Sequence, residues 1–360
     1  MNTQPLIRQT PSAAPRRAYT RAQTLPALLR ERIVLMDGAM GTMIQQLGLT
    51  ELHFRGERFQ AHRCELKGNN ELLCLTQPEV IARIHTAYLQ AGADIIETNT
   101  FGANAIAQED YGLEHLAREM NVAAARLARR ACDELATLDM PRWVAGAIGP
   151  TPRTASISPD VNNPAARNTS FNRLRSAYLE QVEGLIEGGA DLLLVETIFD
   201  TLNAKAALFA IEEAFDATGE QLPVIISGTV TDASGRILSG QTVGGFWASV
   251  RHAQPLAVGL NCAMGAALMR PYLGDLARVA SDTFISCYPN AGLPNPMSPT
   301  GFDESPELTS RLLSEMAHDG MLNLVGGCCG TTPEHIAAIR NTIHGVEPRQ
   351  LSMCQSPEPT

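Results

Sequence analysis

The sequence predicts an α/β protein built as a single parallel (β/α)8 barrel of the TIM type. Eight short, nearly continuous apolar runs alternate with helical segments, which is the pattern of parallel strands covered on both faces. The alternative is a doubly wound open sheet. No Gly-x-Gly-x-x-Gly follows the first run and no Gly-x-x-x-x-Gly-Lys-Ser/Thr occurs in the chain, so the nucleotide-binding form of that sheet is disfavoured.

The strands are predicted where an apolar run ends in Gly, Asn or an acidic residue. In chain order they are Ile33–Met36, Asp94–Glu97, Trp143–Ile148, Asp191–Val195, Val224–Gly228, Ala257–Leu260, Thr283–Cys287 and Asn323–Val325. Helices are predicted between them where apolar residues recur three and four positions apart. They cover Pro78–Gln90, Leu113–Leu135, Phe171–Glu187, Leu202–Thr218 and Pro333–Ile343. Pro78 and Pro333 fall in first helical turns, where proline is well accommodated.

The two ends of the chain differ from the middle. Residues 1–24 hold four arginines and three prolines but no acidic residue, so we expect a disordered arm. An organelle transit peptide is the alternative, although no amphipathic stripe supports it. Residues 25–345 are expected to form the barrel, and residues 346–360 a second disordered tail.

Composition excludes several classes of protein. The net charge of −10 argues against nucleic acid or an anionic membrane as partner. No apolar run approaches the roughly 18–20 residues that a transmembrane helix needs. The eight cysteines are irregularly spaced in a long chain without a secretory signal, which indicates a reducing cytoplasm rather than a disulfide framework.

Active sites of such barrels lie at the carboxyl ends of the strands. The polar and glycine-rich residues there are Asp37, Glu97–Thr100, Gly149–Thr151, Glu196–Thr197, Asn261–Cys262, Tyr288–Gly292 and Gly326–Gly330. None of the eight histidines lies at a predicted strand end. A histidine base or a Cys/His zinc site is therefore disfavoured.

The adjacent cysteines Cys328 and Cys329 are the sharpest local signal. They can face one pocket only if the strand has ended, since neighbouring strand residues point to opposite faces. With Cys262 they would bring three thiolates to the barrel mouth. Three cysteines leave one position open on a tetrahedral zinc, and an open position suits an incoming thiol. A redox-active vicinal disulfide, or simply buried apolar cysteines, are the alternatives.

Two acidic residues, Asp37 and Glu196, end apolar strands. Each could cap a helix or pair with a buried arginine. Opposite a metal, they could instead receive an ammonium group. Backbone N–H groups in the run Asp37–Gly41, at a predicted helix start, suit a carboxylate. Together these features describe a site for an amino acid with a thiol side chain.

At this point the motifs resemble those of the zinc-dependent homocysteine S-methyltransferases. The resemblance rests on Asp37–Thr42, Phe54–Phe59, Glu97–Phe101, Glu196–Thr197 with Asp200–Thr201, Gly259–Cys262 and Gly326–Pro333. Three further stretches are similar to the N-terminal, homocysteine-binding barrel of cobalamin-dependent methionine synthases: Lys67–Asn70, Thr154–Asn162 and Thr231–Arg236. The similarity extends over roughly residues 25–345.

The resemblance implies a role for particular residues. Cys262, Cys328 and Cys329 match the zinc ligands, which position the homocysteine thiolate for catalysis. Asp37 and Glu196 match the acids that hold the homocysteine amine. The residues expected to line the amino-acid pocket are Thr98 and the backbone of Gly38 and Ala39. Asn290, in Tyr-Pro-Asn-Ala-Gly, is a candidate displaceable fourth ligand.

The implied reaction is methyl transfer to L-homocysteine, giving L-methionine, a step of methionine biosynthesis. The sequence after Gly345 shows no folate-binding barrel or cobalamin module. We therefore expect methylcobalamin to come from a separate cobalamin- and folate-binding partner chain, as in a split methionine synthase. S-methylmethionine or betaine is the alternative donor. A non-catalytic subunit that binds zinc and homocysteine is the alternative of another class.

Overall fold

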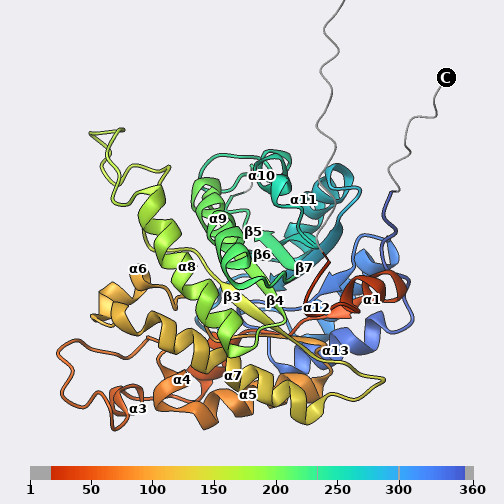
Figure 1. Ribbon diagram of the computed structural model, residues 1–360. Coiled ribbons are helices and arrows are strands. Elements are labelled where there is room, and N and C mark those ends of the chain that lie inside the picture. Colours follow the sequence, from red (N-terminus) through yellow and green to blue (C-terminus); the bar gives the residue numbers. More distant parts are fainter. Residues whose placement is uncertain (1–17, 233, 299–300, 353–360) are drawn as a thin grey trace, which may run out of the picture.

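The computed structural model describes residues 18–232, 234–298 and 301–352. In these ranges eight parallel strands form one sheet in the order β1-β8-β7-β6-β5-β4-β3-β2, and a bridge between Met36 and Ile95 links the two edge strands. The result is a nearly closed barrel surrounded by helices (Figure 1), and the predicted (β/α)8 fold is confirmed. The strands are β1 Val34–Leu35, β2 Ile95–Glu97, β3 Trp143–Ile148, β4 Leu192–Ile198, β5 Val224–Gly228, β6 Ala257–Gly265, β7 Phe284–Asn290 and β8 Leu324–Val325.

All five predicted helices are present. The helices are α1 Leu25–Glu31, α2 Met40–Gln46, α3 Glu51–Arg55, α4 Leu73–Thr76, α5 Pro78–Ala91, α6 Ala105–Gln108, α7 Ala117–Leu135, α8 Phe171–Gly188, α9 Thr201–Thr218, α10 Val243–Val250, α11 Ala266–Val279, α12 Pro306–His318 and α13 Pro333–Ile343. Short 3-10 turns cover Glu109–Tyr111, Glu114–Leu116 and Arg251–Ala253. No helix in the described ranges combines the length and apolarity needed to cross a membrane.

Capping residues explain where the long helices start and stop. Ser170 accepts a hydrogen bond from the backbone N–H of Arg173 at the start of α8. Asp200 caps α9 through the N–H groups of Leu202 and Asn203. Helix α8 ends at Gly189, whose φ of +98° lies in the left-handed region that glycine adopts without steric cost.

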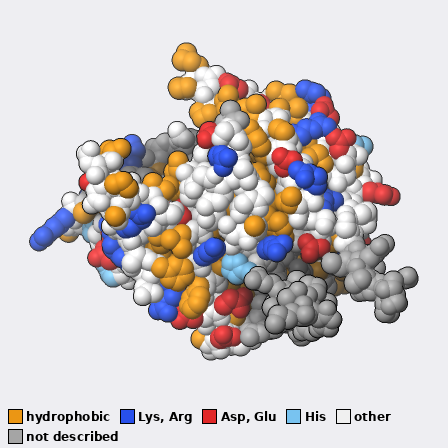
Figure 2. Space-filling view, turned by 90° about the horizontal axis from the view of Figure 1, so that it is seen from above, with side chains coloured by type: hydrophobic (Ala, Val, Ile, Leu, Met, Phe, Trp, Pro, Cys, Tyr) orange, Lys and Arg blue, Asp and Glu red, His pale blue; other side chains and the backbone are white. Residues whose placement is uncertain are grey.

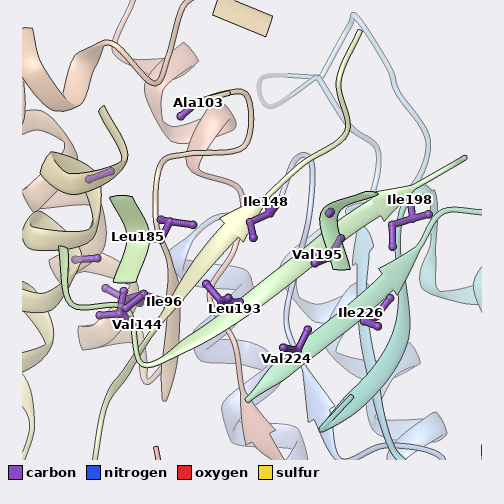
Figure 3. Packing of buried hydrophobic residues seen from close by; sticks show 14 of the residues in the cluster. Ile96, Ala103, Val144, Ile148, Leu185, Leu193, Val195, Ile198, Val224 and Ile226 are labelled. Carbon is purple, nitrogen blue, oxygen red and sulfur yellow. The ribbon is translucent and has the colours of Figure 1, made fainter. Parts of the chain in front are cut away.

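The core has two layers because strand side chains alternate between faces. One set fills the barrel, including Ile95, Ala145 and Leu194. The other set packs against the helices, and Figure 3 shows part of it, with Ile96, Val144, Leu193 and Val195 labelled together with Leu185 of α8. The alternation therefore directs the side chains of Glu97 and Glu196 into the barrel, because each follows an inward-facing residue by two positions. The fold thus places two acids inside the carboxyl-terminal mouth.

The expected boundaries of the tails need correction at both ends. Arg21 donates to the carbonyl oxygens of Ile186 and Ala190 and pairs with Glu220. Arg349 is 9% exposed and donates to the carbonyl oxygen of Thr283. Residues 18–24 and 346–352 therefore pack on the barrel, because their arginines satisfy carbonyl groups there. Residues 1–17 and 353–360, the remainder of the predicted tails, lie outside the described residues.

Candidate metal centre

The structure brings three cysteines together at the barrel mouth. Cys262 lies near the end of β6, and Cys328 and Cys329 follow β8. Their three Sγ atoms all lie within 4.8 Å of one another, and those of Cys262 and Cys329 are 3.9 Å apart. Zinc–sulfur bonds of about 2.3 Å place the sulfurs of a tetrahedral site about 3.8 Å apart. The cluster therefore has the dimensions of a zinc site.

The backbone around the cysteines departs from regular strand geometry, and this departure sets the direction of the thiol groups. Cys262 and Ala263 have φ of +60° and +62°, and the register between β6 and β7 shifts between Asn261 and Gly265. After β8, the N–H of Cys328 donates to the carbonyl of Pro289 at 2.8 Å, and the carbonyl of Cys329 accepts from Ala291. The strand has ended before the pair, as its glycine-flanked sequence predicts.

The three cysteines of the cluster differ in the pKa of their thiols. Hydrogen bonds from Cys328 and Cys329 lower the pKa of Cys262 to about 3. The same contacts raise the pKa of Cys328, and that of Cys329 to about 12. One thiolate is thus stabilised by two thiols. Further deprotonation needs a cation at the centre, and thiolate ligands select soft or borderline metals such as zinc.

The other described cysteines stand apart from this cluster. Burial raises the pKa of Cys74, Cys132 and Cys287 to about 12, as is typical of cysteines that act as small apolar side chains. Cys64 is half-buried and free. Cys354 lies outside the described residues. All seven described cysteines are free, so Cys328 and Cys329 do not form a vicinal disulfide in this structure.

Three carboxyl groups lie at the same mouth, on Asp37 after β1, Glu97 at the end of β2 and Glu196 in β4. Asp37 and Glu196 are 2% and 5% exposed. Asp37 Oδ2 accepts a hydrogen bond from the N–H of Glu97, while its buried Oδ1 has no partner in the described structure. Burial and mutual repulsion raise the pKa of Asp37 and Glu196 well above the ordinary range, and burial raises that of Glu97 to about 8. No basic side chain of the described residues is among the causes of these pKa shifts.

The alternative roles of the acids are therefore not observed. The N-cap of α2 is Ala39 rather than Asp37. The N-cap of α9 is Asp200 rather than Glu196. Two buried carboxyl groups that pair with no cation in the described ranges make a site that a positively charged ligand can complete.

Thr98 lies at the mouth, but its hydroxyl is already engaged. Thr98 Oγ1 accepts from the N–H of Ala147 at 3.0 Å and contacts Thr100 Oγ1 at 2.6 Å. Thr100 donates its own proton to the carbonyl of Ala147, so Thr98 must donate to Thr100. Its hydroxyl has no free proton for a ligand, and any contact with one would use its methyl group or its remaining lone pair.

The segment Gly38–Ala39 is held tightly. The N–H of Ala39 donates to Thr331 Oγ1 at 3.2 Å, so this group of the expected carboxylate site is engaged. A Cβ on Gly38 would come within 2.8 Å of Thr331 Oγ1 and 2.9 Å of the Tyr88 ring. Tyr88 in turn donates to the carbonyls of Ala39 and Thr331. The structure thus fixes the loop after β1 to the loop that carries the cysteine pair.

Asn290 is the last residue of β7 and lies beside the thiols. It is 3% exposed, and its Oδ1 has no hydrogen-bond partner in the described structure. Its amide also helps to lower the pKa of Cys262. A buried, unpartnered carbonyl oxygen at this place fits the predicted fourth ligand.

Sequence reasoning assigned no role to Glu97, Asn261 or Tyr288. All three lie at or near strand ends, and all point into the barrel by strand alternation. Glu97 was visible as an acid ending an apolar strand. Nothing in the local sequence shows that Asn261 and the Tyr288 hydroxyl are buried in the mouth.

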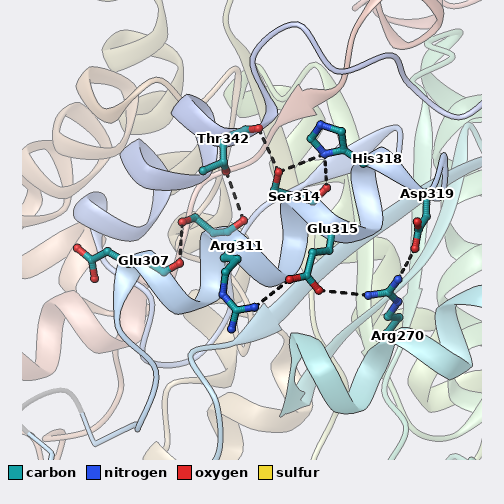
Figure 4. A network of polar contacts seen from close by, with 9 residues as sticks. Arg270, Glu307, Arg311, Ser314, Glu315, His318, Asp319 and Thr342 are labelled. Atoms are coloured by element: carbon teal, nitrogen blue, oxygen red, sulfur yellow. Dashed lines mark hydrogen bonds and ion pairs between the residues drawn. The ribbon is translucent and has the colours of Figure 1, made fainter.

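A second concave region lies away from the strand ends. A groove of about 680 Å³ runs beside α11, α12 and α13 and is lined by Arg270, Glu315 and Asp319 among others. Arg270 pairs with Glu315 and Asp319, and Arg311 also pairs with Glu315 (Figure 4). These four charged side chains are thus engaged in ion pairs with one another rather than free for catalysis. The thiol cluster is the better candidate for chemistry.

Comparison with known proteins identifies the family of the chain. The family model described as homocysteine S-methyltransferase matches residues 34–343. The chain belongs to the homocysteine S-methyltransferase family. The resemblance inferred from the motifs is thereby confirmed at the level of the family, whose substrate is homocysteine.

Solved structures of this family share the fold. The homocysteine methyltransferase MmuM from Escherichia coli, in its oxidised form, is 22% identical with a TM-score of 0.67, covering 88% of this chain and 98% of MmuM. Its metallated form is 23% identical with a TM-score of 0.66, covering 88% and 99%. At this identity the likeness shows a common barrel.

Proposed function

We propose that this chain transfers a methyl group to the thiol of L-homocysteine, giving L-methionine, with zinc held by Cys262, Cys328 and Cys329. One observation carries the proposal. Three thiols whose Sγ atoms lie within 4.8 Å of one another share a barrel mouth with buried carboxyl groups that have no cationic partner among the described residues. Homocysteine has a thiol for the first group and an ammonium for the second.

The residues present fit zinc. The spacing of the sulfurs matches a tetrahedral site, and Asn290 Oδ1 is a buried oxygen without a partner. When bound, zinc would lower the pKa of the substrate thiol and so keep its sulfur nucleophilic near neutral pH. No general base then needs to act during methyl transfer, which agrees with the absence of histidine from the strand ends.

Asp37 and Glu196 would hold the substrate through its ammonium group. Before the substrate binds, the raised pKa values of the two groups favour their protonated forms. A substrate ammonium stabilises the carboxylates and displaces such a proton to solvent. Burial strengthens this contact because little water competes for it. The thiol is thereby fixed at the cysteine side of the mouth.

We further propose that the donor is methylcobalamin carried by a separate cobalamin- and folate-binding chain. The three stretches similar to cobalamin-dependent methionine synthases all belong to strand-to-helix connections on the thiol side. Lys67–Asn70 lies between β1 and α5, Thr154–Asn162 between β3 and α8, and Thr231–Arg236 between β5 and α10. A stretch that contacts a donor or its carrier belongs at this end of the barrel.

Exposed apolar side chains on the strand-to-helix connections after β2, β3, β5 and β7 support a bulky partner. They are Phe101, Val161, Leu238, Leu293 and Met297, between 42% and 98% exposed. Such side chains around a site are typical of surfaces that bind other proteins. On the face shown in Figure 2, acidic and basic side chains are interspersed, with hydrophobic groups between them.

The test is methionine formation by the purified, zinc-loaded chain with L-homocysteine. Free methylcobalamin, S-methylmethionine and betaine are supplied in separate reactions. Turnover with methylcobalamin alone is the expected result. Turnover only with S-methylmethionine or betaine would overturn the choice of donor and keep the thiol chemistry. Homocysteine binding without turnover from any donor would favour a non-catalytic subunit.

A matched pair of variants tests the thiol assignment. Cys328→Ala should lose zinc and activity together. Cys287→Ala is the control, since Cys287 is also buried, lies within β7 and contacts the sulfur of Met269 rather than the thiol cluster. Full zinc content and full activity in Cys328→Ala would contradict the proposal.

A further inference from the structure

Asn261 lies at the centre of a hydrogen-bond network that joins the two halves of the site. Its side chain is fully buried. Asn261 Oδ1 accepts from the N–H of Thr197 at 3.0 Å and from Ser227 Oγ at 2.7 Å. Its Nδ2 donates to Thr197 Oγ1 at 2.8 Å and points to Cys328 Sγ at 4.0 Å, the long limit for an N–H···S contact. Both the oxygen and the nitrogen of the side-chain amide therefore have hydrogen-bond partners.

The contacts of Asn261 fall where the backbone departs from regular strand geometry. Thr197 has a φ of +53°, an outlier for a β-branched residue. The register between β4 and β5 shifts between Val195 and Ile198, and that between β6 and β7 between Asn261 and Gly265. A conformation of this kind persists only where neighbouring groups hold it. The Asn261 amide supplies two hydrogen bonds to Thr197.

Two of the partners of Asn261, Thr197 and Cys328, lie next to the proposed site or within it. Thr197 follows Glu196 in β4, and Cys262 follows Asn261 in β6. Cys328 is one of the three thiols. Strands β4 and β6 are not neighbours in the sheet, because β5 lies between them. The Asn261 side chain spans this gap from inside the barrel, through Ser227 of β5.

We propose that Asn261 is a positioning residue that fixes the amine-binding acid Glu196 relative to the thiol cluster. Through Thr197 it sets the direction of the Glu196 side chain, and through its own backbone and its Nδ2 it places Cys262 and Cys328. Glu196 and the thiols must bind the two ends of one small amino acid. The distance between them must therefore match the length of that substrate. This inference rests on the proposed function, which assigns those two groups to one substrate.

The variant Asn261→Ala tests the inference with binding measurements that need no methyl donor. Cobalt(II) replaces zinc, and its thiolate charge-transfer absorption reports the thiol ligands. Residues that orient metal ligands typically contribute about 10- to 100-fold to metal affinity. We expect a loss of this size in a chelator competition, and at least about tenfold weaker homocysteine binding as Thr197 relaxes.

The matched control is Asn323→Ala. Asn323 is also fully buried and bonds to the backbone at both ends of its amide, accepting from Ile285 and donating to Arg349. It precedes β8, at the opposite end of the barrel. Both variants should lower the melting temperature, but Asn323→Ala should leave both affinities within about twofold of the unmodified chain, since it touches no residue of the site.

A rescue experiment separates positioning from general destabilisation. Glycine adopts a positive φ without cost, so Thr197→Gly in the Asn261→Ala background should recover homocysteine affinity at least about threefold. It should not recover cobalt affinity, because the thiol side still lacks its amide. Recovery of both or of neither would overturn the coupling role.

Two further outcomes keep the inference falsifiable. If Asn261→Ala does not fold, Asn261→Asp keeps the size and the acceptor oxygen but removes the Nδ2 donor to Thr197 Oγ1 and Cys328 Sγ, and its cobalt charge-transfer band should shift. An unchanged band and unchanged affinity in a folded Asn261 variant would overturn the inference. If the unmodified chain binds neither metal nor homocysteine, the proposed function itself fails, and the two failures are thereby distinguished.

Discussion

The Sγ atoms of Cys262 and Cys329 lie 3.9 Å apart although the two cysteines are 67 residues apart in the chain. They belong to β6 and to the segment after β8, which are separated in the sheet by β7. The chain after β8 reaches over the end of β7, where Cys328 donates to Pro289. The cluster therefore exists only in the folded barrel, and metal binding should be coupled to folding.

Metal removal should lower stability. A ligand present at about 1,000 times its dissociation constant stabilises the native state by about 4 kcal/mol. We expect a chelator to lower the melting temperature of the unmodified chain and of Cys287→Ala. Cys262→Ala should melt at the same temperature with and without chelator. A chelator-sensitive melt in Cys262→Ala would show that the metal binds elsewhere.

Glu196→Gln should weaken substrate binding through loss of the ammonium contact. A hydrogen bond to a charged group contributes about 1.5–3 kcal/mol, which corresponds to an increase in KM for homocysteine of about 10- to 100-fold. The control ligand is 4-mercaptobutyrate, which has the thiol and carboxylate but no amine. The unmodified chain should prefer homocysteine strongly, and Glu196→Gln should lose most of that preference. An equal loss for both ligands would assign Glu196 to general structure.

Stability should depend on pH through Glu97. Its pKa is raised from 4.5 to about 8 in the folded chain, so between these values the folded state holds a proton that the unfolded state releases. The free energy of unfolding therefore falls as pH rises through this range. Glu97→Gln removes the effect, so its melting temperature should exceed that of the unmodified chain at pH 8 but not at pH 5. The exposed Glu212→Gln is the control, and an identical pH profile for Glu97→Gln would contradict the prediction.

Gly330→Ala should distort the cysteine loop. Gly330 has a φ of +82°, and an added Cβ would lie 2.5 Å from the Phe302 ring. Gly320 has a φ of +67° but nothing within 4 Å of that position. Gly320→Ala therefore incurs only the backbone cost of about 1–2 kcal/mol, while overpacking adds about 1–3 kcal/mol in Gly330→Ala. Denaturant unfolding and zinc content would check this, and equal losses in both variants would argue against it.

The central part of each strand could be predicted from sequence, but several strand ends could not. Trp143–Ile148 and Val224–Gly228 match the structure because continuous apolar runs define them. Strand β6 continues to Gly265, and β7 to Asn290. These extensions carry polar residues whose pairing depends on a register shift between neighbouring strands. Local apolarity contains no information about such a shift.

The candidate site was predictable where its chemistry is carried by residue type. Cys262, Cys328 and Cys329 were identified by their positions at strand ends, and the structure brings them together. The hydroxyl of Thr98 was not predictable in the same way, because its proton is used by Thr100 on its own strand end. A role for Asn261 could not be predicted from the sequence, since its partners come from β4, β5 and the loop after β8.

The number of sulfur atoms bound to zinc tests the central claim most directly. X-ray absorption at the zinc edge would be measured on the purified chain before and after addition of L-homocysteine. The account predicts three sulfur ligands and one nitrogen or oxygen ligand before addition, and four sulfur ligands afterwards. Three sulfurs in both samples, or fewer than three at the start, would contradict it.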